Sequence, residues 1–276
     1  MAAVEELGYV IHPVARALKR GGTGIVLLDL HGWTPSVALD RYVASLDKLL
    51  AQKDLSLLVH HGTGSASQLR KVAIQVAAHT VTSLRSFPPG DVAKMETAGI
   101  QVLAGGATAG PELGHERMQV QHLAARGHEV IAHARPADSS LDAMINDRRS
   151  ATRRAARDLA LRVAAELLVT DKPEANAAAL AKVLARDPEI TAIAAYNDDV
   201  ALAVLAAART IGLRVPDQLA VIGVDDIPLG ALWSPALTTL ALDYHRAAAL
   251  TAAYITGAPT NVDTDHIYEL RVRQST

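Results

Sequence analysis

Short apolar runs alternate with longer segments of mixed polarity along most of the chain. The run at 25–30 is apolar except for Asp29, as expected of a strand that is buried on both faces. Such runs predict strands at 25–30, 55–59, 80–84, 101–104, 129–134, 192–196, 219–224 and 266–272. The segments between them predict helices at 36–52, 65–78, 91–98, 115–125, 146–166, 175–185, 200–211 and 244–256. Strands that alternate with helices predict an α/β fold with parallel sheets flanked by helices.

The residues before the first strand follow a different pattern. Residues 2–7 are typical of the end of a helix, which Gly8 stops, and Pro13 precedes a second short helix at 14–19. Two turns of helix are marginal in isolation, because helix nucleation is costly. We therefore expect the helix at 14–19 to be ordered only with a partner.

Polar residues follow both strands of a βαβ unit at 192–239. Asn197 comes after the first strand and Asp225 after the second. Open α/β sheets bind ligands at the carboxyl ends of their strands, so both residues are candidate ligand contacts. Asp198 or Asp199 is the expected N-cap of the intervening helix. For Asp225, helix capping and ligand binding both remain open.

Arg154 and Trp33 are two further candidates. Arg154 lies in a cluster with Arg148, Arg149, Arg153 and Arg157, most of which are expected on a solvated face. Arg149, Arg153 and Arg157 are four residues apart and form a basic stripe. Arg154 lies outside this stripe, and its guanidinium could point into a cleft and donate hydrogen bonds to the hydroxyls or the carboxylate of a ligand. Trp33 follows the first strand and could stack on a sugar ring, although packing in a core or an interface fits it equally well.

Composition and motifs narrow the class of protein. The chain has 27 Lys and Arg against 29 Asp and Glu, so any contact with nucleic acid must be local. It has no Cys, no P-loop, no GxSxG motif and no complete dinucleotide fingerprint, and His128 and His133 are one residue too far apart for HExxH. We therefore expect no enzyme activity, no cofactor and no metal site. No apolar run reaches the roughly 20 residues of a membrane span, and no secretory signal is evident, so we expect a cytoplasmic protein without a membrane partner.

Several motifs occur in an order that resembles the effector-binding domain of the lactose/galactose repressor (LacI/GalR) family of transcription regulators. They are Asn197-Asp198-Asp199, Gly212-Leu213-Arg214-Val215-Pro216, Val221-Ile222-Gly223-Val224-Asp225-Asp226 and Pro235-Ala236-Leu237-Thr238-Thr239. Residues 123–133 and 269–276 are similar to two further blocks of that family. Residues 7–18 are similar to the end of its DNA-binding headpiece and its hinge helix.

The resemblance implies two Rossmann-like lobes around a cleft, in the periplasmic-binding-protein-like (type I) arrangement with three crossovers. By motif position, Asn197, Asp225 and Arg154 match the effector contacts of the family. Leu18 matches the hinge leucine that wedges into the minor groove of DNA, with Ala15 and Arg16 beside it.

The resemblance also implies the extent of each part of the chain. Residues 1–13 correspond to the remnant of the headpiece, and residues 14–21 to the hinge helix and linker. The N-terminal lobe is expected to comprise 22–134 plus 242–260, and the C-terminal lobe 135–241 plus 261–276.

The function implied is the effector-sensing and dimerisation part of a transcription repressor. We expect a sugar or a sugar-like metabolite as the effector, operator DNA bound through the hinge and a headpiece that this chain lacks, and a homodimer that reads two half-sites. Leu242 stands where some members have an effector-binding Gln, and residues 171–184 contain no aromatic residue. The sequence therefore leaves open whether the effector is a sugar, a smaller molecule of another class, or absent. The alternative is a solute-binding protein of the same fold that serves transport.

Overall fold

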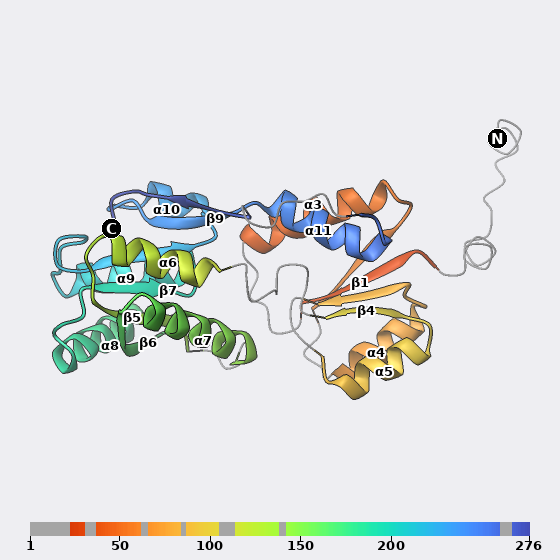
Figure 1. The fold of residues 1–276 in the computed structure, drawn as a ribbon, viewed down its shortest axis with the longest axis horizontal. Helices are drawn as coiled ribbons and strands as arrows, with labels where there is room; N and C mark the ends of the chain where they lie inside the picture. Colours follow the sequence, from red (N-terminus) through yellow and green to blue (C-terminus); the bar gives the residue numbers. More distant parts are fainter. Residues whose placement is uncertain are drawn as a thin grey trace, which may run out of the picture. The chain divides into compact units, whose positions relative to one another are not determined.

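A computed structural model describes residues 23–30, 37–61, 66–83, 87–104, 114–137, 142–259 and 267–276. The predicted helices at 2–7 and 14–19 lie outside these residues, as do Leu18, Ala15, Arg16 and Trp33. The described residues form two sheets of mainly parallel strands flanked by helices, which confirms the predicted α/β class (Figure 1). The chain divides into two compact units, which are described separately: unit 1 (1–34, 42–109 and 248–262) and unit 2 (35–41, 110–247 and 263–276).

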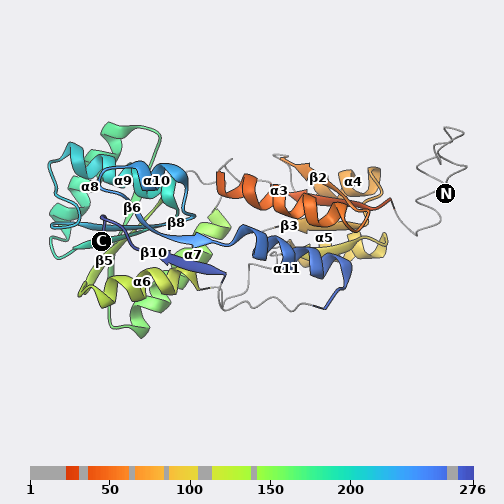
Figure 2. The same cartoon turned by 90° about the horizontal axis from the view of Figure 1, so that it is seen from above.

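Unit 1 contains a sheet of four parallel strands in the order β2-β1-β3-β4. The strands are β1 (Ile25–Asp29), β2 (Ser56–His60), β3 (Thr80–Ser83) and β4 (Gln101–Ala104). The helices are α3 (Val37–Ala51), α4 (Ala66–Gln75), α5 (Pro89–Thr97) and α11 (Tyr244–Thr256), of which α3 and α11 begin within unit 2. Two views place α3 beside α11, and a hydrogen bond of 2.9 Å joins Tyr42 to Thr251 (Figures 1 and 2).

Unit 2 contains a sheet of six strands in the order β10-β9-β8-β7-β5-β6. The strands are β5 (Val130–Pro136), β6 (Arg162–Val169), β7 (Ala192–Ala195), β8 (Ala220–Val224), β9 (Thr238–Leu242) and β10 (Tyr268–Arg271). All neighbouring pairs are parallel except β9 and β10, which are antiparallel. The uniformly parallel sheet that the alternating pattern predicts therefore has one antiparallel edge strand.

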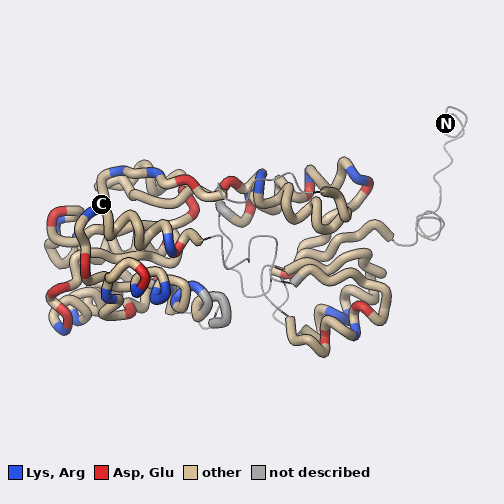
Figure 3. Tube along the Cα trace, viewed as in Figure 1, with Lys and Arg blue, Asp and Glu red and all other residues tan. Residues whose placement is uncertain are grey.

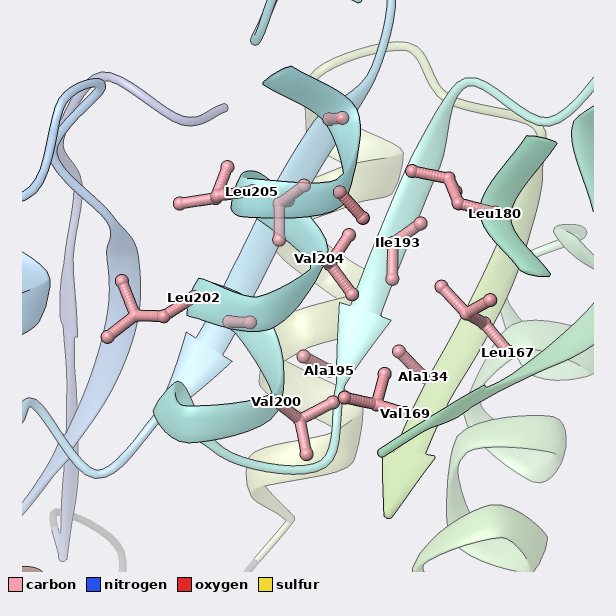
Figure 4. Packing of buried hydrophobic residues seen from close by; sticks show 14 of the residues in the cluster. Ala134, Leu167, Val169, Leu180, Ile193, Ala195, Val200, Leu202, Val204 and Leu205 are labelled. Carbon is pink, nitrogen blue, oxygen red and sulfur yellow. The ribbon is translucent and has the colours of Figure 1, made fainter. Parts of the chain in front are cut away.

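Helices cover both faces of the unit 2 sheet. They are α6 (His115–Ala125), α7 (Asp142–Asp158), α8 (Pro173–Arg186), α9 (Asp198–Thr210) and the short α10 (Pro228–Leu232). One apolar core lies between the sheet and α8 and α9, where Leu180, Ile193 and Val204 are buried (Figure 4). A second lies on the opposite face, against α6 and α7. Two buried faces explain why β7 and β8 read as uninterrupted apolar runs in the sequence.

The structure corrects the predicted boundary between the lobes. The N-terminal lobe was expected to include residues up to 134, but residues 110–134 belong to unit 2. The reason is strand pairing, since β5 lies between β7 and β6 in the unit 2 sheet. A local pattern identifies β5 as a strand but does not identify the strands beside it.

The structure also corrects the long helix predicted at 146–166. Helix α7 ends at Asp158, and Ala160 adopts a left-handed conformation with φ 59°. The chain then enters β6, which pairs with β5 along its length. The run 163–168 (VAAELL) is compatible with helix and with strand, so the pairing with β5 decides its conformation.

Candidate functional site

The carboxyl ends of β7 and β8 meet at one edge of the unit 2 sheet, where polar side chains gather. Asn197 follows β7, and its side-chain oxygen accepts a hydrogen bond of 3.0 Å from the backbone N–H of Val200. Asn197 is thus the N-cap of α9, and the prediction that Asp198 or Asp199 would cap this helix is wrong. Because Oδ1 of Asn197 is used by this cap, we expect its side-chain amide nitrogen to donate a hydrogen bond to a ligand.

Asp225 follows β8 in a left-handed conformation with φ 110°. Its backbone N–H donates to Leu240, and its carbonyl oxygen accepts a hydrogen bond from the hydroxyl of Tyr244. Helix α10 begins at Pro228 without a side-chain cap, so Asp225 does not serve as a helix cap. Burial raises the pKa of the Asp225 carboxyl to about 7, although Arg148 opposes this shift.

Arg148 of α7 reaches the same edge. Its Nη1 donates a hydrogen bond of 2.7 Å to the carbonyl oxygen of Tyr196, and its guanidinium carbon lies 4.3 Å from the centre of the Tyr196 ring. Burial opposes the charge of Arg148, but Tyr196, Glu116, Tyr268 and Asp225 raise its pKa above the ordinary value. The guanidinium is therefore held in place by the carbonyl oxygen and the ring of Tyr196, and nearby carboxylates favour its charge.

Glu116, in the first turn of α6, supplies a second carboxylate. Its Oε1 lies 2.9 Å from Nε2 of His115, and the His115 ring lies 5.0 Å from the ring of Tyr268. Burial disfavours the charged carboxylate, yet the charge of Arg148 and the contact with His115 lower the pKa of Glu116 to about 2. Burial and Arg148 also lower the pKa of His115, so the imidazole is neutral at pH 7 and Arg148 is the cation that favours the Glu116 carboxylate there. Glu116 is therefore ionised at neutral pH.

Asp198 connects the loops that carry this site. It is fully buried, and its carboxylate accepts a hydrogen bond of 2.9 Å from the N–H of Ile227 and one of 2.6 Å from the hydroxyl of Thr239. A Cβ atom at Gly223 would lie 2.0 Å from Oδ1 of Asp198, which explains a glycine within an otherwise apolar strand. Burial raises the pKa of Asp198 to about 7. The isolated Gly223 was the sequence signal for a close approach at this point.

Arg154 is exposed on α7, and Arg148 instead reaches the neighbourhood of Asp225. Three other arginines, Arg135 of β5 and Arg149 and Arg153 of α7, each lie 3.2–3.4 Å from the carboxylate of Glu166 in β6. Figure 3 shows the basic positions along α7. The structure thus brings Asn197, Asp225 and Arg148 to one edge of the sheet, and it brings Glu116, Tyr196 and Tyr268 to Arg148.

Within the described part of the chain, no group of three His, Cys, Asp or Glu side chains could hold a metal ion. His128 bonds to Thr191, whereas His133 is buried in the sheet. Among the same residues, no helix is long and apolar enough to cross a membrane.

Unit 1 carries a smaller polar group at the corresponding edge of its own sheet. Asp29 ends β1 and is buried, and its carboxylate lies 3.3 Å from Nδ1 of His60 at the end of β2. The hydroxyl of Ser83, at the end of β3, donates to Asp29 at 3.5 Å. All three residues come from strands.

Comparison with known proteins places the chain in a family. Residues 120–276 match the model of the periplasmic binding protein-like domain. The transcriptional repressor PurR of Vibrio cholerae is 32% identical over 125 residues, which are 45% of this chain and 37% of the repressor. The transcriptional regulator GntR of Pseudomonas aeruginosa is 25% identical over an alignment that covers 99% of this chain and 85% of the regulator.

Solved structures share the fold. A LacI family regulator from Silicibacter pomeroyi superposes with a TM-score of 0.72 at 21% identity, over 91% of this chain and 98% of that one. A LacI family regulator from Arthrobacter sp. FB24, in complex with lactose, superposes with a TM-score of 0.67 at 22% identity, over 91% and 98%. The chain therefore belongs to the family of periplasmic-binding-protein-like domains, as found in the LacI/GalR transcription regulators.

Proposed function

We propose that the chain is the effector-sensing part of a dimeric LacI/GalR-type transcription repressor in the cytoplasm. The observation that carries this proposal is the group of Arg148, Asp225 and Asn197 at the carboxyl edge of the unit 2 sheet, where such folds bind small molecules. Family membership supports a regulator rather than an enzyme. Binding, and not turnover, is the role assigned to these residues, and no cofactor is invoked.

The proposed effector is a sugar or a sugar-like metabolite. Asp225 would accept hydrogen bonds from hydroxyl groups, whereas the guanidinium of Arg148 and the amide of Asn197 would donate to hydroxyl oxygens. The lactose found in the Arthrobacter regulator supports this class of ligand. Arg148 replaces Arg154 in this assignment because Arg154 lies on an exposed position of α7. The proposed stacking role of Trp33 stays a prediction outside the described residues.

The ligand site is tested by thermal unfolding with a panel of monosaccharides and disaccharides. Asn197→Ala and Asp225→Asn are expected to abolish sugar-induced stabilisation while leaving the fold intact, because each loses a hydrogen bond of about 1–3 kcal/mol in a desolvated site. Arg154→Ala serves as the matched control and is expected to retain the stabilisation. Full stabilisation in both site variants would overturn the assignment.

The regulatory role is tested with the full reading frame that contains this chain, including any headpiece encoded before residue 1. A gel shift with DNA from its own gene region should show preference over scrambled DNA, and a stabilising sugar should change the affinity. Sedimentation should give a dimer, since two half-sites are read by two copies. We further propose that Leu18, Ala15 and Arg16 form the hinge contact with the minor groove, so Leu18→Ala should weaken specific binding.

A solute-binding protein is the alternative. It predicts sugar-induced stabilisation in the same assay, but no sequence preference in the gel shift and a mature protein outside the cytoplasm. The two experiments together therefore separate the regulator from the transport protein.

A further inference from the structure

The turn that follows β8 has an unusual backbone. Asp225 has φ 110° and Asp226 has φ 50°, although neither residue is a glycine. Residues with a Cβ atom rarely adopt positive φ, and the value at Asp225 lies beyond the left-handed α region of about +50 to +70°. Such a conformation costs free energy and persists only where surrounding contacts hold it. The turn at 225–226 therefore depends on partners elsewhere in the chain.

Tyr244, the first residue of α11, is one of these partners. Its hydroxyl donates a hydrogen bond to the carbonyl oxygen of Asp225. On the other side of the same residue, the N–H of Asp225 donates to the carbonyl oxygen of Leu240 in β9 at 2.8 Å. Both backbone groups of Asp225 are thus bonded, and a change of its φ or ψ would break at least one of these bonds.

Arg273, which follows β10, is the second partner. Its Nη2 donates to Oδ1 of Asp226 at 2.6 Å, and its Nη1 donates to the carbonyl oxygen of Leu237 at 2.8 Å. Its own backbone N–H donates to the hydroxyl of Thr238 at 2.9 Å, so the arginine is fixed to β9. The side chains of Arg273 and Asp226 are 21% and 27% exposed, so solvent screens this charge-assisted hydrogen bond only in part.

We infer that Tyr244 and Arg273 are positioning residues that hold Asp225 in the orientation required for ligand binding. The inference rests on the proposed effector site and goes further by assigning two residues that set its affinity through the turn. The φ of Asp225 determines the direction of its Cβ atom and hence of its carboxylate. A carboxylate that is already oriented binds more tightly, because the ligand does not have to supply the free energy of straining the turn.

The first test requires no ligand. The scalar coupling between the amide proton and the Hα proton reports φ, and it is measured for Asp225 and Asp226 by nuclear magnetic resonance. In Tyr244→Phe and in Arg273→Met, the couplings of the turn are expected to move toward the values of negative φ. Unchanged couplings in both variants would overturn the inference.

Two matched controls lie on the same elements. Tyr254→Phe removes a hydroxyl from an exposed side chain of α11. Arg271→Met removes a guanidinium of β10 whose partner is Glu269, at 2.8 Å and on the surface. Both controls are expected to leave the couplings of the turn and the affinity for ligand unchanged.

The second test measures affinity by calorimetric titration. The probe is the member of the sugar panel that most raises the melting temperature of the unsubstituted protein. Tyr244→Phe is expected to weaken its binding about three- to tenfold, as the loss of one neutral hydrogen bond does, and Arg273→Met by at least about tenfold. Changed couplings with unchanged affinity would overturn the inference and leave the effector site standing.

A double-mutant cycle with Asp226→Gly separates positioning from a merely structural role. Glycine adopts φ 50° without strain and removes the carboxylate that Arg273 holds. If Arg273 acts through Asp226, Arg273→Met changes the affinity by less than about twofold in the Asp226→Gly background. The same loss in both backgrounds would contradict the role of Arg273, because its bonds to Leu237 and Thr238 would then account for the effect.

The outcomes separate this inference from the proposed function. If no sugar of the panel binds, the effector site is overturned, and the couplings still decide whether Tyr244 and Arg273 hold the turn. If Arg273→Met does not fold, Tyr244→Phe carries both measurements, since it removes a single oxygen atom.

Discussion

The sheets of unit 1 and unit 2 both carry polar side chains at the carboxyl ends of their strands, but these side chains come from different kinds of element. In unit 1 the group consists of Asp29, His60 and Ser83, each at the end of a strand. In unit 2 Arg148 and Glu116 come from helices α7 and α6. The second site therefore depends on how two helices pack on the sheet, and the first depends on strand register alone.

This difference bears on stability and on function. A polar group within a strand is placed by pairing with its neighbours, and the 3.3 Å contact of Asp29 with His60 joins paired residues of β1 and β2. A helical Arg148 can approach Asp225 only when α7 is docked. We therefore expect substitutions at the unit 2 edge to have larger effects on the free energy of unfolding than those at the unit 1 edge.

The largest effect is expected for Gly223→Ala in unit 2. The new Cβ would lie 2.0 Å from Oδ1 of the buried Asp198, so β8 or the Asp198 carboxylate must shift. We expect a loss of about 3 kcal/mol or more in urea unfolding. Gly90→Ala in α5 of unit 1 is the control, because nothing lies within 4 Å of its Cβ, and its loss should be near zero. Equal losses would contradict the close packing assigned to Gly223.

A pH dependence of about 2–4 kcal/mol is expected from Asp198 and Asp225. Burial raises the pKa of each from 3.8 to about 7, so the folded state binds protons more tightly than the unfolded state. The stabilising contribution is complete below about pH 4 and is lost as the pH rises to about 7. Asp198→Asn should therefore lose less stability than the unsubstituted protein between pH 5 and pH 8.

The contribution of Glu116 to the free energy of unfolding has the opposite pH dependence. Its pKa falls from 4.5 to about 2 in the folded state, so its contribution is present above about pH 4.5 and is lost as the pH falls toward 2. Urea unfolding of Glu116→Gln between pH 5 and pH 2.5 checks this direction. A steeper loss in the variant than in the unsubstituted protein would contradict it.

Arg148→Ala is expected to lose about 2–3 kcal/mol, because the buried carboxylate of Glu116 would lose a positive charge that favours its ionised form. Partial access of solvent to Arg148 keeps the loss below that of a fully buried ion pair. Arg154→Ala, on the exposed face of the same helix, should change stability by less than about 0.5 kcal/mol. Similar losses in the two variants would show that α7, and not the charge of Arg148, is responsible.

The smallest effect is expected for His60→Ala in unit 1. The imidazole is partly exposed and its 3.3 Å contact with Asp29 is long, so the loss should be below about 1 kcal/mol in urea unfolding. A loss as large as that of Arg148→Ala would remove the contrast between the two edges.

The sequence by itself determined the type and order of most elements, because their apolar periods are local. The helices at 115–125 and 244–256 and the strand at 101–104 agree with the structure residue for residue. Asn197 and Asp225 were also identifiable, since each directly follows a strand of a βαβ unit. The LacI/GalR resemblance, which rests on such local motifs, is confirmed by the comparisons.

Only the tertiary structure decided which strands are neighbours and which helical side chains reach the site. Because β6 pairs with β5, the second part of the segment 146–166 is a strand and not the end of a long helix. Residues 110–134 belong to unit 2, since β5 lies in the sheet of that unit. The docking of α7 brought Arg148, and not Arg154, to Asp225, and the docking of α6 supplied Glu116. These contacts join residues that are distant in sequence, so their energies depend on packing and burial, which no local pattern encodes.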